Sequence, residues 1–400
     1  TDISGNVASL SAGRSFGVAG RKRAMLVRGD LASATATTGQ LYNDIRVGGK
    51  ITGAVSVGRA VSVPGNNALG TGSVVSFGRI GSVTSAGDFG GDIISYSGGI
   101  GSVTITNGSL MKGRLVAAYG GDLESLTITN GDLLGNVRAD VDIRSLRVTS
   151  AADGVFGNVG INPARSQYTR YDAYRNQLPV GADATTALDG PTISAGRNIV
   201  SVSVGGSSFE AVYQAGRAVR NIAVAGSMVG DGFSSAYSSA VVAGDSIDAV
   251  SVGGALDRAQ FIAGGVSLGG DGRPGGTSIS NADVVKSGTI TRVTVGGAAT
   301  NSQFLAGVLP GADGQYGTGD DRVALGTSTI TTLTLGSATN VLAKADSLSS
   351  SVAGDARLTR VTDITQAEAL VDSGVGVPGA AVTSGQAMSY ASGTVTVTYS

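Results

Sequence analysis

The chain of 400 residues contains no cysteine, no histidine and no tryptophan. Without cysteine there is no disulfide and no thiolate nucleophile, and without histidine there is no imidazole base or metal ligand. A Ser-His-Asp triad and a structural zinc site are therefore excluded. Charged residues make up only 14% of the chain, against roughly 25% in average globular proteins, and the formal net charge is −1. This balance offers no electrostatic basis for recruiting nucleic acid or an anionic membrane.

Proline is also scarce, whereas glycine is abundant, with 7 and 65 residues respectively. The glycines show no period of three, which excludes a collagen-like chain. Because 41% of the residues are hydrophobic, the chain can bury a large core, and general disorder is not expected. The charge-free stretch 373–400 is rich in Ser, Thr and Gly, so we do not expect it to span a bilayer.

One short phrase recurs along the chain: an apolar residue, two variable residues, then two apolar residues separated by one position, and a turn with Gly or Asn. Copies beginning at Ile80, Ile100, Leu123 and Ile143 follow one another at intervals of 20 to 23 residues. Other gaps are longer, which indicates a fixed unit of about 20 residues with insertions. Clear copies are IGSVTITNG (100–108), LESLTITNG (123–131), IRSLRVTS (143–150), IVSVSVGG (199–206), IDAVSVGG (247–254) and ITRVTVGG (290–297).

The last two apolar positions of each phrase lie two residues apart, so in a strand they face the same side. In most copies the residue between them is Ser or Thr, a small polar residue that suits the opposite side. This alternation predicts an inward set and an outward set. The inward set is Val202, Val204, Val250, Val252, Val293 and Val295, and the outward set is Ser203, Ser251 and Thr294.

Such short strands bury their apolar faces only by stacking one unit on the next. The sequence therefore predicts an all-β fold, a right-handed parallel β-helix (solenoid) with coils of about 20 residues and loop insertions. A β-sandwich or a propeller with a period of roughly 40 residues is the alternative. We expect the solenoid to cover residues 1–362, with an insertion around 152–192, and a C-terminal tail with a terminal strand to occupy 363–400.

The repeats resemble those of secreted, cysteine-free β-solenoids of bacterial surfaces, such as autotransporter passengers and the Gly/Thr/Ser-rich repeat proteins of planctomycete-like bacteria. The resemblance covers roughly residues 1–362. It implies an extracellular or cell-surface location and a structural, adhesive or scaffold role. Polysaccharide lyases and hydrolases also use parallel β-helices, so the fold alone does not exclude an enzyme.

The insertion PGADGQYGTGDDR (310–322) carries Asp313, Asp320 and Asp321 on a glycine-rich loop. Carboxylate and carbonyl oxygens are the ligands that Ca²⁺ prefers, so these three residues form a candidate Ca²⁺ site. The spacing is not that of an EF-hand, and the alternative is a polar glycine turn. Related insertions near Asp271 and Asp153 keep a single carboxylate each.

The segment PARSQYTRYDAYRNQLP (163–179) alternates Tyr168, Tyr171 and Tyr174 with arginines. Tyr and Arg are enriched in interfaces, so this segment is a candidate contact for another subunit or a cell-surface glycan. Stacking of single-stranded nucleic acid is a further possibility for such a pattern, but the surrounding chain is neutral to acidic. The alternative is a long loop that folds onto the flank of the solenoid.

Two other patterns are weaker candidates for functional sites. Asp122 and Asp142 precede successive copies of the phrase, so their carboxylates are expected about 5 Å apart, as in a retaining glycosidase. Aspartate is also a routine turn residue before a strand, and we expect Glu124 to form an ordinary charge pair with Arg144 in the next coil. The triplet RGD at 28–30 matches an integrin-binding motif, but such a match arises readily by chance.

The two ends of the repeat suggest self-assembly. Val7 and Leu10 already belong to a coil, with no amphipathic cap before them. At the other end SGTVTVTYS (392–400) places Val395, Val397 and Tyr399 on one face of an alternating strand. An open first coil and a free terminal strand are complementary, so head-to-tail association of copies is expected.

Together these features predict a non-enzymatic structural subunit of an extracellular filament or surface layer, with another copy of itself as its partner. The alternative is a secreted β-helix protein that binds or degrades polysaccharide. Acidic or basic residues gathered along one face would favour the alternative, and open apolar ends favour the polymer.

Overall fold

The computed structural model describes residues 2–12, 24–36, 44–57, 72–149, 157–160, 190–230, 239–264, 287–309, 322–323, 327–360, 386–391 and 394–399. The chain divides into two compact units. Unit 1 comprises residues 1–196 and 200–211, and unit 2 comprises residues 197–199 and 212–400.

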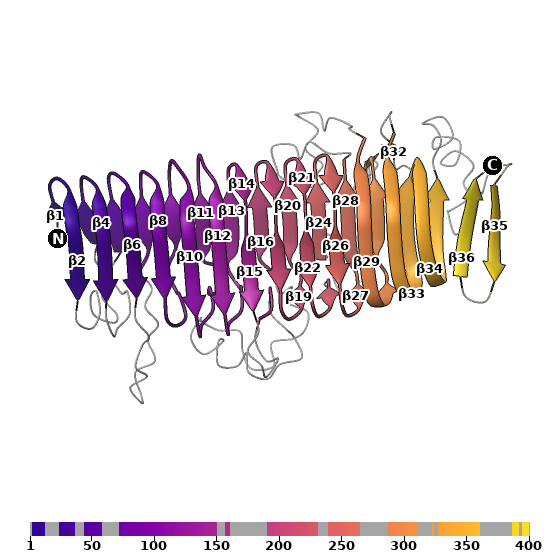
Figure 1. The fold of residues 1–400 in the computed structure, drawn as a ribbon, viewed down its shortest axis with the longest axis horizontal. Coiled ribbons are helices and arrows are strands. Elements are labelled where there is room, and N and C mark those ends of the chain that lie inside the picture. The colour runs from indigo at the N-terminus through magenta and orange to yellow at the C-terminus, as the bar shows by residue number, and fades with distance from the viewer. Residues whose placement is uncertain are drawn as a thin grey trace. The chain divides into compact units, whose positions relative to one another are not determined.

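Unit 1 contains two long stacks of parallel strands (Figure 1). In each stack a strand pairs with the strand one coil earlier and the strand one coil later. The first stack consists of β1 (Asp2–Ile3), β3 (Ala24–Val27), β5 (Asp44–Val47), β7 (Val74–Ser76), β9 (Ile93–Ser95), β11 (Leu115–Ala118), β13 (Asn136–Ala139) and β16 (Thr192–Ala195).

The second stack of unit 1 carries the repeated phrase. It consists of β2 (Val7–Ala12), β4 (Leu31–Ala36), β6 (Ile51–Val57), β8 (Ile80–Ser85), β10 (Ile100–Thr106), β12 (Leu123–Thr129), β14 (Asp142–Ile143), β15 (Leu146–Thr149) and β18 (Val202–Val204). A third, shorter side is formed by single parallel bridges that end at β19 (Ser208–Phe209).

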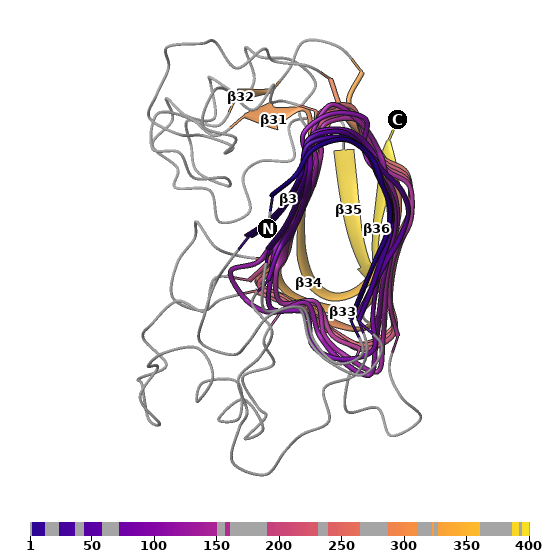
Figure 2. The ribbon, with the colours of Figure 1, turned by 90° about the vertical axis from the view of Figure 1, so that its left-hand side faces the viewer.

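Seen from its N-terminal end, unit 1 shows successive coils superimposed as a flattened ring (Figure 2). Ile80, Ile100, Leu123 and Ile143 occupy one register position on successive coils, and each is fully buried. The prediction of a parallel β-solenoid is therefore confirmed, and the parallel pairings rule out a β-sandwich or a propeller. The right-handed sense of winding stays a prediction.

The repeated Asn-Gly turn of unit 1 follows from the close approach of successive coils. Asn107 and Asn130 both have φ 55°, a left-handed conformation that Asn tolerates better than most residues. The Asn130 amide donates to Oδ1 of Asn107, 2.9 Å away, so the two coils are linked through their turns. A side chain at Gly131 would collide with the carbonyl of Gly108 one coil earlier, which explains why Gly follows Asn in both copies.

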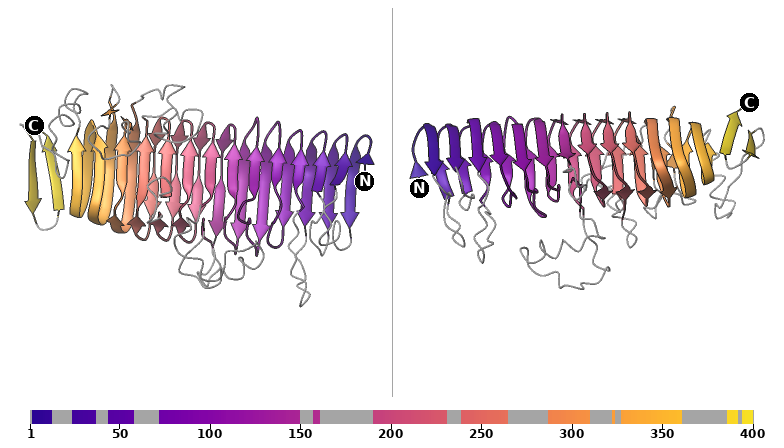
Figure 3. Two further views of the ribbon diagram at one scale, coloured as in Figure 1. Left: turned by 180° about the vertical axis from the view of Figure 1, so that it is seen from behind. Right: turned by 60° about the horizontal axis from the view of Figure 1, so that its bottom comes forward.

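Unit 2 is also built from parallel strands that pair from one coil to the next. Its first strands are short and its later strands are longer (Figure 3). Its strands are β17 (Asn198–Ile199), β20 (Val212–Ala215), β21 (Ala218–Val219), β22 (Ile222–Val224), β23 (Met228–Val229), β24 (Ser239–Ala243), β25 (Ser246–Ile247), β26 (Val250–Val252), β27 (Leu256–Asp257), β28 (Ala259–Ala263), β29 (Thr289–Thr300), β30 (Gln303–Ala306), β31 (Val308–Leu309), β32 (Arg322–Val323), β33 (Thr329–Ala345), β34 (Ser347–Arg360), β35 (Gln386–Ala391) and β36 (Thr394–Tyr399).

The predicted inward residues of the phrase are confirmed in both units. Val202 and Val204 in unit 1, and Val250, Val252, Val293 and Val295 in unit 2, are each at most 1% exposed. Ser203 and Ser251 are exposed as predicted, whereas Thr294 is half-buried.

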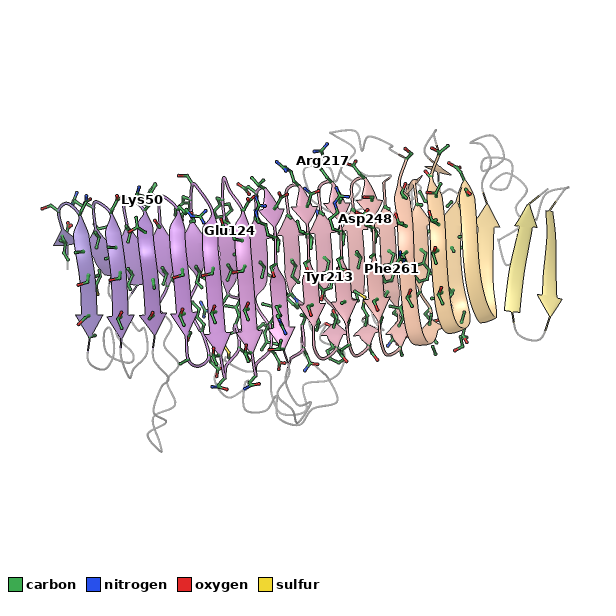
Figure 4. All side chains as sticks on the ribbon, in the orientation of Figure 1. Lys50, Glu124, Tyr213, Arg217, Asp248 and Phe261 are labelled. Atoms are coloured by element: carbon green, nitrogen blue, oxygen red, sulfur yellow. The ribbon has the colours of Figure 1, made fainter. Side chains whose placement is uncertain are left out.

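The core of unit 2 contains aromatic rings as well as aliphatic side chains. Tyr213, Phe261 and Phe304 are fully buried, and Figure 4 labels the first two. The rings of Phe261 and Phe304 stack one coil apart, with centroids 4.9 Å apart and planes 18° from parallel. Such a pair stabilises coil stacking beyond simple area burial.

The predicted boundary at residue 362 and most of the predicted insertion at 152–192 lie outside the described residues. In the described part of the chain, no helix has the length and apolar character that crossing a membrane requires.

Candidate functional site

The predicted site residues fall into three groups. Asp313, Asp320 and Asp321, and likewise Tyr168, Tyr171 and Tyr174, lie outside the described residues. Val7 and Leu10 lie on β2 at the beginning of unit 1, and Val395, Val397 and Tyr399 lie on β36 at the end of unit 2. The structure therefore gives geometry for the two candidate assembly ends, while the ion loop and the Tyr/Arg segment stay predictions.

The edge of β2 is apolar and incompletely covered. Val7 and Leu10 are half-buried, whereas Leu31 and Ala34, which occupy the same register positions one coil later, have no exposed surface. Among the described strands only β4 pairs with β2, so the other edge of β2 keeps its N–H and C=O groups unpaired by any of these strands. This edge has the chemical character of a coil-stacking surface.

The terminal strand β36 is placed differently from the sequence-based prediction. It pairs antiparallel with β34 through Val352 and Val395, and antiparallel with β35 through all six residues from Gln386 to Ala391. The prediction of a free edge at β36 is therefore wrong, because alternation identifies a strand but not its neighbours. The edge without a partner among the described strands is that of β35, which is labelled in Figure 1.

The carboxylate of Asp122, one of the two acidic residues considered for catalysis, is held by the fold. Its Oδ1 accepts the backbone N–H of Asp142 at 3.1 Å, and its Oδ2 accepts Nε and Nη2 of Arg144 at 3.0 and 2.6 Å. The hydrogen bond to Asp122 raises the pKa of the Arg144 guanidinium. A carboxylate fixed in this way clamps one coil to the next, which gives Asp122 a structural role.

Glu124 does not pair with Arg144 as expected. Its Oε1 accepts Nη2 of Arg79 at 2.8 Å, and the two side chains are about half exposed (Figure 4). The pairing therefore skips a coil, and an exposed ion pair of this kind contributes at most about 1 kcal/mol to stability.

A ladder of polar side chains runs along one corner of unit 1, which we call the corner ladder. Asp88 Oδ1 accepts the N–H of Ser109 at 2.8 Å, and Ser109 Oγ accepts the N–H of Asp132 at 2.9 Å. Asp132 Oδ1 accepts the N–H of Asn158 at 2.8 Å, and Asn158 Oδ1 accepts the N–H of Ser207 at 2.9 Å. Each side chain of the ladder accepts a hydrogen bond from a backbone N–H of the next coil. In a turn without regular strand pairing, such an N–H would otherwise lack an acceptor.

A second corner of unit 1 uses the same device. Asp44 Oδ1 accepts the N–H of Ser73 at 3.1 Å, Ser73 Oγ accepts that of Asp92 at 3.0 Å, and Asp92 Oδ1 accepts that of Leu115 at 3.0 Å. Several acidic side chains of unit 1 thus form hydrogen bonds that link one coil to the next. This favours a structural role for these carboxylates over a catalytic one.

The RGD triplet is also part of a corner. Arg28 pairs with Asp2, with Nη2 and Oδ2 2.6 Å apart, and this hydrogen bond lowers the pKa of the Asp2 carboxyl. The N–H of Asp30 donates to Oδ1 of Asn6 at 2.8 Å, and Asp30 Oδ1 accepts the N–H of Lys50 at 3.0 Å. Arg28 and Asp30 are bound by their own fold, which argues against integrin recognition.

The sequence-based prediction missed a row of aromatic rings on unit 1, which we call the aromatic ladder: Phe77 and Tyr96, which are exposed, and Tyr119, which is half-buried. The ring centroids lie 5.4 Å apart for the first pair and 6.0 Å apart for the second. The signal was present in the phrases VVSFG, IISYS and VAAYG, each of which ends a strand of the first stack. When the three strands are placed in parallel register on successive coils, the residues that follow them lie side by side.

The fold defines a class of protein, a parallel β-solenoid, and several described polar side chains of unit 1 link one coil to the next. Comparisons with protein-family models, curated proteins and solved structures give no match. Within the described ranges, no group of three or more acidic side chains is placed to hold a metal ion.

Proposed function

We propose that this chain is a non-enzymatic structural subunit of an extracellular filament or surface layer, in which copies associate head to tail. The observation that carries the proposal is the apolar edge of β2, where Val7 and Leu10 are half-buried although the equivalent residues of the next coil are fully buried. A further coil stacked on this edge would bury both side chains and pair the backbone groups of β2.

The strand directions at the end of unit 2 support this association. Because β36 is antiparallel to β34 and β35 is antiparallel to β36, β35 runs in the same sense as β34, which itself pairs parallel with β33. The edge of β35 therefore offers a strand with the sense of a solenoid coil. Strand β35 has six residues, the same length as β2. A contact between two different edges is heterologous, and it propagates unless it closes into a ring.

The commitment of carboxylates to coil corners supports a structural protein over an enzyme. The extracellular or cell-surface location in this proposal rests on the resemblance to bacterial surface solenoids. A secreted protein that binds or degrades polysaccharide is the second candidate, and the aromatic ladder is the observation that favours its binding form.

Replacing Leu10 with Asp tests the proposed stacking edge. A charge on an edge that must be buried against another copy cannot be desolvated cheaply, so we expect the variant to stay monomeric where the parent chain forms polymers. Analytical ultracentrifugation over a range of protein concentrations measures the difference.

The matched control is Ser9→Asp, which adds the same charge to an exposed position of the same strand. We expect this control to polymerise like the parent chain, and circular dichroism to show that both variants are folded. A parent chain that sediments as a monomer at every concentration, or a Leu10→Asp variant that polymerises normally, contradicts the proposal.

We also propose that residues 310–322 bind Ca²⁺ through Asp313, Asp320 and Asp321. A ligand that binds only the folded chain raises its stability, so excess chelator is expected to lower the thermal unfolding midpoint. Changing all three residues to Asn should abolish the response to chelator. Identical melting curves of the parent chain with Ca²⁺ and with chelator would rule the site out.

A further inference from the structure

The aromatic ladder occupies one register position on three successive coils of unit 1. The N–H groups of Tyr96 and Tyr119 donate to the carbonyls of Ser76 and Ser95 on the preceding coil, at 2.9 and 2.8 Å. Each ring thus follows directly after a strand of the first stack, and the row runs across the strands in the direction in which coils stack.

Two of the three rings of the ladder are exposed to solvent, and the third, Tyr119, is half-buried. Phe77 is 63% exposed and Tyr96 is 50% exposed, although Tyr96 has a ring on each side. Inside unit 2, by contrast, the stacked rings of Phe261 and Phe304 are completely buried. Exposed aromatic rings gathered in one place form a candidate interaction surface.

A second apolar row lies beside the ladder on the same face. Val75 and Ile94 are register partners on β7 and β9, two residues before Phe77 and Tyr96, and both are half-buried. The two rows span two strand spacings in one direction and two residues in the other, about 10 Å by 7 Å. This area is far below the roughly 800 Å² per partner of a stable protein–protein interface, so the patch suits a narrow ligand.

The charges around the patch are balanced. The Arg138 guanidinium lies 5.2 Å from the centroid of the Tyr119 ring and also pairs with Asp140, at 3.4 Å. Arg46 pairs with Asp44 at 2.9 Å. Single-stranded nucleic acid needs a positively charged groove along its backbone, and these paired arginines do not supply one. The balance favours an uncharged ligand.

We propose that the aromatic ladder binds a neutral, extended, β-linked polysaccharide that runs along the direction of coil stacking. A pyranose ring is apolar on its faces and polar on its rim, which matches Tyr, with its apolar ring and its hydroxyl group. The length of one sugar residue in an extended β-linked chain is close to the strand spacing, so successive sugars meet successive rings. Arg138 donates to sugar hydroxyls at one end of the row.

Isothermal titration calorimetry of the full chain tests this assignment, with cellohexaose as the extended β-linked probe, maltohexaose as the curved α-linked probe, and a dT oligonucleotide. We expect binding of cellohexaose alone. The double variant Phe77→Ala/Tyr96→Ala is expected to raise its Kd by about tenfold, since two aromatic contacts are lost. The control Val200→Ala, which truncates another exposed apolar residue of unit 1, should leave Kd unchanged.

Circular dichroism melting checks that both variants remain folded, as we expect because the truncated side chains are exposed. Absence of heat with cellohexaose overturns the assignment, as does an unchanged Kd in the double variant. Equal or tighter binding of maltohexaose or of the oligonucleotide also overturns it. The result does not depend on polymer formation, because calorimetry reports binding to single subunits and to filaments alike.

Discussion

Replacing Val293 with Asp is expected to destabilise unit 2 by about 4 kcal/mol, because an unpaired carboxylate would lie in an apolar stack. Val293 has no exposed surface, and its register partners are Val250 on the preceding coil and Leu333 on the following one. Neither neighbour supplies a hydrogen-bond donor from its side chain, so nothing compensates the lost hydration. Urea denaturation followed by circular dichroism measures the loss.

The control is Ser251→Asp, which introduces the same charge on the exposed side of the partner strand β26. We expect this substitution to change the free energy of unfolding by no more than about 0.5 kcal/mol. Comparable losses for Val293→Asp and Ser251→Asp would show that the inward and outward sides are not distinct, and the solenoid core would then be misassigned.

Replacing Asp132 with Ala is expected to cost about 3 kcal/mol and to loosen one corner of unit 1. Asp132 is 1% exposed, and its Oδ1 accepts the N–H groups of Gly157 and Asn158 at 3.0 and 2.8 Å. The same oxygen accepts the side-chain amide of Asn158 at 3.2 Å. The Gly157 N–H also donates to the carbonyl of Gly131 at 3.1 Å, so removing the carboxylate chiefly leaves the backbone N–H and the side-chain amide of Asn158 without this acceptor. The desolvation penalty of such buried donors exceeds the net value of the hydrogen bonds themselves.

Hydrogen exchange at the Asn158 amide locates the effect. We expect a large loss of protection there in Asp132→Ala and a smaller one in Asp132→Asn, which keeps an acceptor oxygen at the same place. Because solenoid coils contact mainly their neighbours, amides several coils away should keep their protection. A uniform loss along unit 1, or none at Asn158, would contradict the role given to the corner ladder.

Much of the fold could be predicted from the sequence, because the alternation of apolar and polar residues in the repeated phrase indicates which side chains are buried. Val202 and Val204 flank Ser203, and the structure buries the two valines and exposes the serine. The same pattern predicts Thr294 to be exposed, yet it is half-buried. Alternation tells which side a residue faces, but the degree of exposure depends on neighbours from other coils.

Features that depend on partners distant in sequence could not be predicted as well. Asp122 looked like a member of a catalytic pair until its hydrogen bonds to Arg144 and to the next coil were known. Phe77, Tyr96 and Tyr119 are separated by 19 and 23 residues, and only the strand register places them side by side. Likewise, the alternation of residues 394–399 predicts a strand correctly, but it does not predict the antiparallel pairing of β36 with β34 and β35.

Fibre diffraction from aligned filaments of the full chain is the most direct test of head-to-tail coil stacking. If copies continue one another's solenoid, strands lie across the filament axis and repeat along it at the spacing of neighbouring strands. We predict filaments with a strong meridional reflection at about 4.8 Å. A chain that forms no filaments, or filaments in which this reflection lies on the equator, would contradict the account.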